Sequence, residues 1–111
     1  MKFLSISSLK DTVSTLPPAI SRQLMEATVD WVNQQKQAGM ILEVYFIPGW
    51  NRTMVIREAK TTEEVAETLA TLPTRPFIDI EFYPLADFNE SMKAVIESAK
   101  KAEQLFPSAP K

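Results

Sequence analysis

The sequence predicts an α+β protein whose strands and helices follow the order β-α-β-β-α-β, with an added helix at the C-terminus. Two observations indicate this class. The hydrophobic pattern switches between the two-residue period of a strand and the 3.6-residue period of a helix. Pro, Gly and Asn fall at the switches, where chain reversals need them. The chain has 111 residues, 45% of them apolar, which suits one domain with one core.

The first half of the chain contains a strand, a long helix and a hairpin. Residues 3–9 alternate and carry β-compatible side chains, which indicates a strand. Residues 18–38 show apolar side chains at helical spacing, and Gly39 follows where a left-handed C-terminal cap is needed. Residues 41–47 and 52–59 alternate on either side of a Pro-Gly-Trp-Asn reversal, so we expect a β-hairpin.

The second half continues with a helix, a strand and a helix. Thr61 and Glu64 have the spacing of a capping box ahead of a short helix. Residues 77–84 alternate as a strand. A last helix is expected to be capped near Asp87 or Asn89 and to run to about Leu105.

Two split β-α-β units in this order predict a ferredoxin-like plait, a four-stranded antiparallel sheet with two helices on one face. Right-handed crossovers make the predicted strand order 4-1-3-2. We expect a single domain over residues 1–106 and a flexible C-terminal tail over residues 107–111.

The predicted register gives the two faces of the sheet different side chains. The first face is apolar and is expected to lie under the helices; it carries Leu42, Val44, Phe46, Met54, Ile56, Ile78, Ile80 and Phe82. The second face is aromatic and charged; it carries Phe3, Glu43, Tyr45, Ile47, Val55, Arg57, Phe77, Asp79, Glu81 and Tyr83. This face is too apolar to stay in water, so we expect a second copy to stack on it. The product is a dimeric α+β barrel. The alternative is that the C-terminal helix covers the face within the same chain.

The composition restricts the chemistry and the partners. The chain has no His and no Cys, which excludes thiol nucleophiles, Ser-His dyads, disulfides and imidazole-ligated metals. The net charge is −2, and the sequence shows no concentrated basic face, so no nucleic-acid partner is expected. The sequence has neither an apolar run long enough to span a membrane nor the features of a signal peptide. A cytoplasmic location is therefore predicted.

Carboxylates, an arginine and aromatic side chains form the candidate site. Asp79 and Glu81 lie two residues apart on one strand and therefore point to the same side. Desolvation in a closed barrel would raise the pKa of at least one of them and make it a general acid or base. Arg57 would clamp a substrate carboxylate. The predicted substrate-binding residues are Glu43, Tyr45, Trp50, Phe77 and Tyr83.

A second interpretation of the same residues needs no substrate. In it, Arg57 neutralises Glu43, Asp79 or Glu81 as an interface salt bridge, because paired charges on adjacent strands are common. Neither interpretation includes a metal site, because the carboxylates show no calcium-loop pattern. No cofactor is expected.

Residues 72–85 read Leu-Pro-Thr-Arg-Pro-Phe-Ile-Asp-Ile-Glu-Phe-Tyr-Pro-Leu, a run that resembles the fourth-strand signature of muconolactone isomerase-like proteins, approximately L-P-x-x-P-[F/Y]-x-D-I-E-x-x-x-L. The resemblance covers roughly residues 20–87. It implies a ferredoxin-like subunit that pairs into dimeric barrels and can assemble into decamers. It also implies a cofactor-independent proton shift that moves a lactone double bond. The His and Arg of the family's second strand are missing from residues 41–46 of this chain.

The sequence therefore predicts a muconolactone isomerase-like protein of undetermined substrate, a homodimer or larger homo-oligomer. Its expected activity is cofactor-free acid/base isomerisation of a small lactone or carboxylic acid in a cavity between paired sheets. In this hypothesis Asp79 or Glu81 is the base and Arg57 the anion clamp. The alternatives are a non-catalytic oligomeric module that binds a small molecule and, third, a cofactorless monooxygenase.

Overall fold

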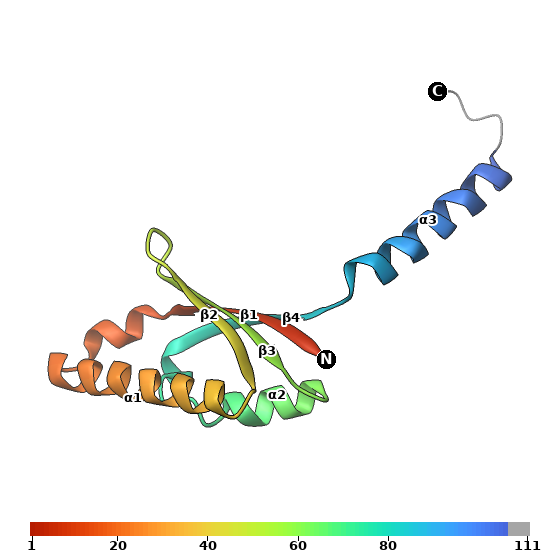
Figure 1. The fold of residues 1–111 in the computed structure, drawn as a ribbon. Coiled ribbons are helices and arrows are strands. Elements are labelled where there is room, and N and C mark those ends of the chain that lie inside the picture. The colour runs from red at the N-terminus through yellow and green to blue at the C-terminus, as the bar shows by residue number, and fades with distance from the viewer. Residues whose placement is uncertain (107–111) are drawn as a thin grey trace.

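The computed structural model describes residues 1–106, and the predicted tail at 107–111 lies outside the described residues. The main elements follow the predicted order (Figure 1). They are β1 (Lys2–Leu9), α1 (Pro18–Gln37), β2 (Ile41–Ile47), β3 (Arg52–Glu58), α2 (Thr62–Leu69), β4 (Ile78–Leu85) and α3 (Phe88–Leu105). Short 3-10 turns over Asp11–Thr15 and Arg75–Phe77 join β1 to α1 and lead into β4.

The four strands form one antiparallel sheet in the order β2-β3-β1-β4, which confirms the predicted order 4-1-3-2. Helices α1 and α2 lie together on one face of this sheet (Figure 1). The α+β class and the ferredoxin-like arrangement are therefore confirmed. We call the face away from α1 and α2 the open face.

Local sequence signals explain where the elements begin and end. Helix α1 begins with Pro18, whose missing N–H is not needed in the first turn. Gly39 follows α1 with a φ of +77°, a backbone conformation that glycine adopts without strain. Asn51 takes a φ of 49° in the turn between β2 and β3. Thr61 Oγ1 accepts a hydrogen bond of 3.1 Å from the backbone N–H of Glu64, as the capping-box spacing predicts.

The side chains of β1 and β3 face opposite to the predicted direction. In the observed register Phe3 pairs with Arg57 and Ser5 pairs with Val55, all four on the helix-covered face. Phe3 is fully buried, and Arg57 is 4% exposed. The prediction that Phe3, Val55 and Arg57 lie on the second face is therefore wrong. Met54 and Ile56, which were expected under the helices, lie on the open face.

A bulge in β2 explains a further difference. The register shifts between Ile41 and Glu43, so that Leu42 has no partner on β3. Ile41 turns into the core beside Arg57, and Leu42 is exposed instead of lying under the helices. Beyond the bulge, Val44 and Phe46 pair with residues of the helix-covered face and Glu43 and Tyr45 with residues of the open face, as predicted.

The core lies between the sheet and the two helices α1 and α2. Its buried members come from all these layers; they are Phe3, Trp31, Ile41, Val55, Ala59, Val65 and Leu69. Trp31 Nε1 donates a hydrogen bond of 2.9 Å to Thr71 Oγ1, which satisfies the polar atom of the largest aromatic side chain in this cluster.

Helix α3 leaves the end of β4 and extends away from the rest of the protein (Figure 1). It contains no buried residue. The alternative that the C-terminal helix covers the second face within the same chain is therefore wrong for this conformation. None of the helices over residues 1–106 combines the length and the apolar character needed to cross a membrane.

The open face remains apolar although the register differs from the predicted one. Its apolar side chains come from all four strands; they are Leu4, Ile6, Leu42, Tyr45, Ile47, Met54, Ile56, Tyr83 and Leu85. Charged residues also lie there, among them Glu43, Asp79 and Glu81. A partner is therefore still expected on this face, because its surface is apolar, although the residues that form it differ in part from those predicted.

Candidate functional site

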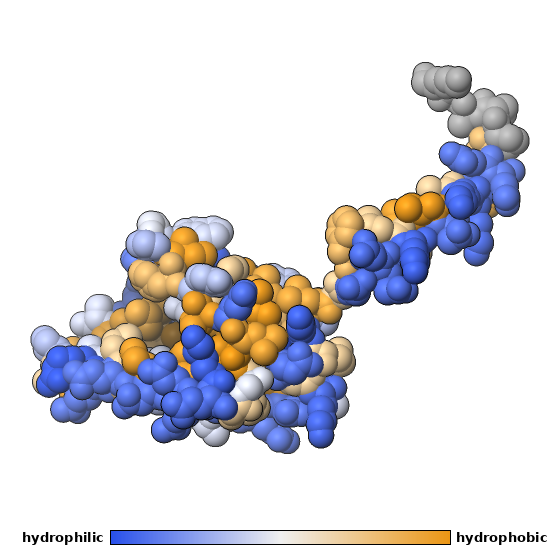
Figure 2. All heavy atoms as spheres, viewed as in Figure 1, coloured by the Kyte–Doolittle hydropathy of each residue, from blue (hydrophilic) through white to orange (hydrophobic). Residues whose placement is uncertain are grey.

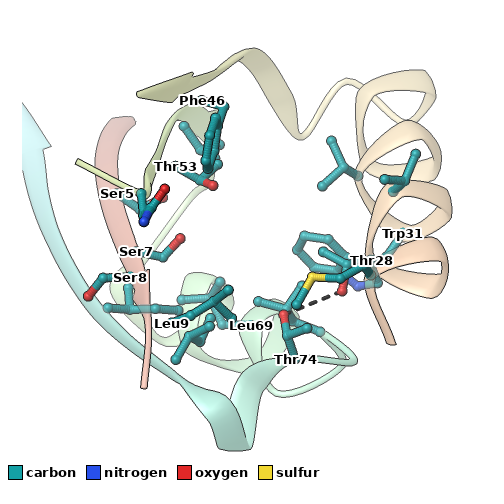
Figure 3. Close-up of a pocket in the computed structure, with 18 of the residues that line it drawn as sticks. Ser5, Ser7, Ser8, Leu9, Thr28, Trp31, Phe46, Thr53, Leu69 and Thr74 are labelled. Carbon is teal, nitrogen blue, oxygen red and sulfur yellow. Dashed lines mark hydrogen bonds between the residues drawn. The ribbon is translucent and has the colours of Figure 1, made fainter. Parts of the chain in front are cut away.

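A cavity of about 310 Å³ lies between α1 and the helix-covered face of the sheet (Figure 3). Its volume falls at the lower end of the range of small-molecule sites. Most of the lining is apolar, with Leu9, Trp31, Phe46, Leu69 and Ile80 among the contributors. The cavity thus lies inside one chain, whereas the sequence predicted a cavity between two paired sheets.

Hydroxyl groups are the main polar feature of the lining. Ser7 and Thr53 are paired across β1 and β3, and Thr28 faces them from α1 (Figure 3). Thr74 contributes another hydroxyl and lies 3.4 Å from Thr28, measured between the two Oγ1 atoms. Thr28 also donates a hydrogen bond of 2.8 Å to the carbonyl oxygen of Leu24. Ser and Thr hydroxyls can donate and accept hydrogen bonds, so they suit oxygen atoms of a ligand.

Arg57 is the one charged residue among the described residues that line the cavity. Its side chain is buried, and its Nε has no hydrogen-bond partner within residues 1–106. None of the salt bridges of the described chain includes Arg57. Burial lowers the pKa of its guanidinium because it disfavours the charged form. A buried charge without a counter-charge destabilises the fold. An anion that enters the cavity would therefore pair with a guanidinium that is already buried and positively charged.

The sheet separates Arg57 from most of the other predicted site residues. Asp79, Glu81 and Tyr83 lie on the open face of β4. Glu43 and Tyr45 lie on the same face of β2. The constellation predicted around Arg57 is therefore not assembled within one chain. Within the described residues of one chain no carboxylate lies within 4.0 Å of Arg57, so the salt bridge of the second interpretation does not form inside the chain.

The two remaining predicted residues lie outside the cavity lining. Trp50 is exposed at the tip of the β2–β3 hairpin, where the guanidinium carbon of Arg52 lies 4.3 Å from the centre of its ring. Such a contact is a cation–π interaction. Phe77 is half-buried in the 3-10 turn before β4.

The sequence-based interpretation missed the hydroxyl residues of the cavity. A signal for them existed in β1, where Ser5 and Ser7 occupy the same face as Phe3. Serine is uncommon in a fully buried strand face. Two of them in alternation indicate that this face borders a space rather than a packed core.

Tyr83 and Glu81 form a small hydrogen-bonded pair on the open face. Tyr83 Oη donates to Glu81 Oε2 at 3.1 Å. This hydrogen bond, together with the negative charge of Glu81, raises the pKa of Tyr83 above 10.0. We expect Glu81→Gln to lower the pKa of Tyr83, because it removes the charge that opposes formation of the phenolate.

An ultraviolet absorbance titration of the phenolate measures this change. Tyr45→Phe serves as the background, because the sequence has two tyrosines and this variant leaves Tyr83 alone. An unchanged titration of Tyr83 after Glu81→Gln would show that the pair does not form in solution.

Comparisons with known proteins place the fold. Residues 1–91 match the family model of muconolactone delta-isomerase. The crystal structure of a muconolactone isomerase is similar, with a TM-score of 0.68 and 24% sequence identity, over 78% of this chain and 90% of that chain. A second similar structure is 5-chloro-2-hydroxyhydroquinone dehydrochlorinase from Burkholderia phenoliruptrix in complex with 2,5-dihydroxybenzoquinone. Its TM-score is 0.62 and its identity 12%, over 81% of this chain and 98% of that chain. No curated protein matches the sequence.

Proposed function

Since the chain belongs to the muconolactone delta-isomerase family, we propose that its cavity binds a small, largely apolar molecule through an anionic group that pairs with Arg57. One observation carries this proposal. Arg57 is 4% exposed, lines the cavity and has neither a salt bridge nor a partner for its Nε among residues 1–106. A carboxylate is the natural complement, because the planar guanidinium can donate two parallel hydrogen bonds to it.

The spacing of the lining residues along β3 indicates which groups the rest of the ligand would carry. On the same face of β3, Val55 lies two residues and Thr53 four residues before Arg57, so the Cα atoms of Thr53 and Arg57 are roughly 13 Å apart. The lining also includes Val55 and Trp31, and Ser5, which pairs with Val55, adds a hydroxyl. The apolar part of the lining supports a ligand with an apolar ring. Its second oxygen function would reach Ser7 and Thr53.

Isomerisation of a lactone or carboxylic acid is the second candidate, and family membership is the observation that favours it. Such a reaction needs a group that takes a proton and returns it. Among the residues described as lining the cavity there is no carboxylate, lysine or tyrosine. Asp79 or Glu81 stays the predicted base of this candidate, and it would act at the open face, where a second copy is expected.

The proposal includes self-association through the open face, as a homodimer or larger homo-oligomer. The apolar residues gathered there support it, because a monomer rarely leaves such a patch in water. The cytoplasmic location stays a prediction.

Binding of benzoate tests the role of Arg57, and benzyl alcohol provides the uncharged comparison. We expect Arg57→Met to weaken benzoate binding about 10- to 100-fold, the loss of a charge-assisted hydrogen bond. Arg52→Met is the matched control, because Arg52 lies on the same strand but on the opposite face. Calorimetric titration of the three proteins measures the affinities. An assay of muconolactone turnover with the same proteins tests the second candidate, isomerisation.

The control should bind benzoate as the wild type does, and benzyl alcohol should bind all three proteins equally weakly. Equal benzoate affinities of the wild type and Arg57→Met would overturn the proposal. So would a wild type that does not bind benzoate.

A further inference from the structure

Two threonine hydroxyls lie side by side in the wall of the cavity. Thr28 comes from α1, and Thr74 comes from the segment just before the 3-10 turn Arg75–Phe77 (Figure 3). The Oγ1 atoms of the two threonines are 3.4 Å apart. Thr74 is 4% exposed, so the cavity is the route by which another hydrogen-bonding group can reach its hydroxyl.

The hydrogen of the Thr28 hydroxyl is already used within α1. Thr28 Oγ1 lies 2.8 Å from the carbonyl oxygen of Leu24, which can only accept, so the single hydrogen of this hydroxyl points to that oxygen. The longer contact between Thr28 and Thr74 therefore takes its hydrogen from Thr74. The three oxygens form a directed chain, in which Thr74 donates to Thr28 and Thr28 donates to Leu24. With its own hydrogen used, Thr74 Oγ1 is left with the capacity to accept.

The local sequence explains why this accepting capacity of Thr74 stays unused. A threonine before a helical turn commonly accepts a hydrogen bond from a backbone N–H two or three residues later. Here the second residue is Pro76, which has no N–H, and the N–H of Phe77 donates to the carbonyl oxygen of Thr74 at 2.8 Å. The Thr74 hydroxyl therefore makes no hydrogen bond to the turn. Its one partner among residues 1–106 is Thr28 Oγ1.

The mouth of the cavity is apolar. Leu9, Val29 and Phe46 line the cavity and are 45–61% exposed, so they form its entrance. Figure 2 shows apolar side chains in the recess between α1 and the β2–β3 hairpin. A hydroxyl group that leaves water for such a cavity loses its hydrogen bonds to water, and binding is weakened unless the interior supplies an acceptor. An acceptor at Thr74 therefore decides between a hydroxylated ligand and the same ligand without the hydroxyl.

We propose that Thr74 Oγ1 accepts a hydrogen bond from a hydroxyl group of the ligand, so that the cavity selects a hydroxylated carboxylic acid. This inference rests on the proposed function, in which Arg57 holds the carboxylate. A protonated amine is a poor occupant, because the described lining holds no carboxylate and its charged residue is itself positive. A ketone or ether oxygen can only accept, so it would have to take the hydrogen that joins Thr74 to Thr28. A hydroxyl instead extends the chain and polarises its hydrogen bonds in the same direction.

The positions of Arg57 and Thr74 along β1 set the length of the ligand. Arg57 pairs with Phe3 near the start of the strand. Ile78 pairs with Leu9 at its end, and Thr74 lies four residues before Ile78. From Phe3 to Leu9 the strand spans about 20 Å. The long side chain of Arg57 covers part of this distance, so a ring joined to its carboxylate by a short chain suits both contacts better than benzoate does.

Calorimetric titration with phenylpropanoate and with its para-hydroxy and para-methoxy derivatives tests this role of Thr74. We expect the wild type to bind the hydroxy acid about 2- to 10-fold more tightly than phenylpropanoate, the contribution of one neutral hydrogen bond. The methoxy acid cannot donate a hydrogen bond and should not share this gain. Thr74→Val should abolish the preference for the hydroxy acid, whereas Thr74→Ser, which keeps the hydroxyl, should retain it.

Two further variants separate the hydrogen-bonded chain from a general effect of losing a threonine hydroxyl. Thr68→Val is the matched control, because Thr68 Oγ1 donates at 2.9 Å to the carbonyl oxygen of Glu64 as Thr28 does to that of Leu24. Thr68 is not among the described residues that line the cavity, so this variant should keep the preference. Thr28→Val removes the acceptor of the Thr74 hydrogen, which can then point to the ligand. The preference for the hydroxy over the methoxy acid should therefore shrink.

Equal affinities of the wild type for the hydroxy acid and for phenylpropanoate would overturn the role of Thr74, and so would a preference that persists in Thr74→Val. The wild-type comparison needs no variant, so it decides the question even where Thr74→Val does not fold. Binding of benzoate through Arg57, without a gain from the added hydroxyl, would overturn the role of Thr74 alone. Failure of the wild type to bind benzoate and all three phenylpropanoates would overturn the proposed function as well.

Discussion

Arg57→Met is expected to raise the free energy of unfolding of the ligand-free protein by about 1–3 kcal/mol. Arg57 is 4% exposed, its Nε lacks a hydrogen-bond partner within the described residues, and no carboxylate there compensates its charge. Methionine keeps much of the apolar stem and removes the buried charge. The same variant should lose benzoate binding. A residue that lowers the stability of the fold and strengthens ligand binding is typical of a functional site.

The increase in the free energy of unfolding caused by Arg57→Met should not depend on pH in the neutral range. Burial lowers the pKa of Arg57 in the folded state below its ordinary value, so the unfolded chain holds the proton more tightly than the folded one. Stability of the wild type therefore rises with pH only where the pH passes through the lowered pKa, which is far into the alkaline range. Between about pH 6 and about pH 8 both states are protonated, and the penalty is constant.

Urea denaturation of wild type, Arg57→Met and Arg52→Met at these two pH values measures the effect. Arg52→Met should change the unfolding free energy little, apart from the loss of its contact with Trp50. A loss of 1 kcal/mol or more in Arg57→Met would mean that the guanidinium supports the fold, and it would remove the physical basis of the proposed site.

The sequence predicts the elements and topology because their signals are local. Capping at Thr61, the reversal around Asn51 and the alternation of residues 78–83 each depend on neighbours within a few positions. The strand order then follows from the connection rules. In β4 the apolar residues Ile78, Ile80 and Phe82 alternate with polar ones, so the face assignment of that strand was correct.

The faces of β1 and β3 could not be derived in the same way. Residues 54–56 are all apolar, and in β1 both Phe3 and Leu4 are apolar, so alternation alone does not choose a face. The pairing between strands decides it, and it places Phe3 and Arg57 together on the helix-covered face. Because the observed register places Arg57 on the helix-covered face, the candidate site lies on the opposite side of the sheet from the predicted one. An assignment of Arg57 from sequence would have required knowing the register first.

Phe3→Ala is expected to lower the free energy of unfolding by about 3–5 kcal/mol, the largest loss among the substitutions considered. Phe3 is fully buried at the centre of the core cluster. Its ring meets Phe82 edge to face, with 6.5 Å between the centroids and 75° between the planes. Truncation removes this contact and leaves a cavity next to Arg57 that neighbours on three strands cannot easily fill.

Leu4→Ala is the matched control because Leu4 is the next residue of the same strand and points to the open face. It is half-buried, so its truncation should cost about 1–2 kcal/mol at protein concentrations where the chain is a monomer. Urea denaturation measures both variants, and failure of Phe3→Ala to fold beside a folded Leu4→Ala counts as the larger loss. The reverse order, with Leu4 costing more than Phe3, would contradict the observed register. It would return Arg57 to the open face beside Asp79 and Glu81, so this pair of variants also decides on which side of the sheet an anion can bind.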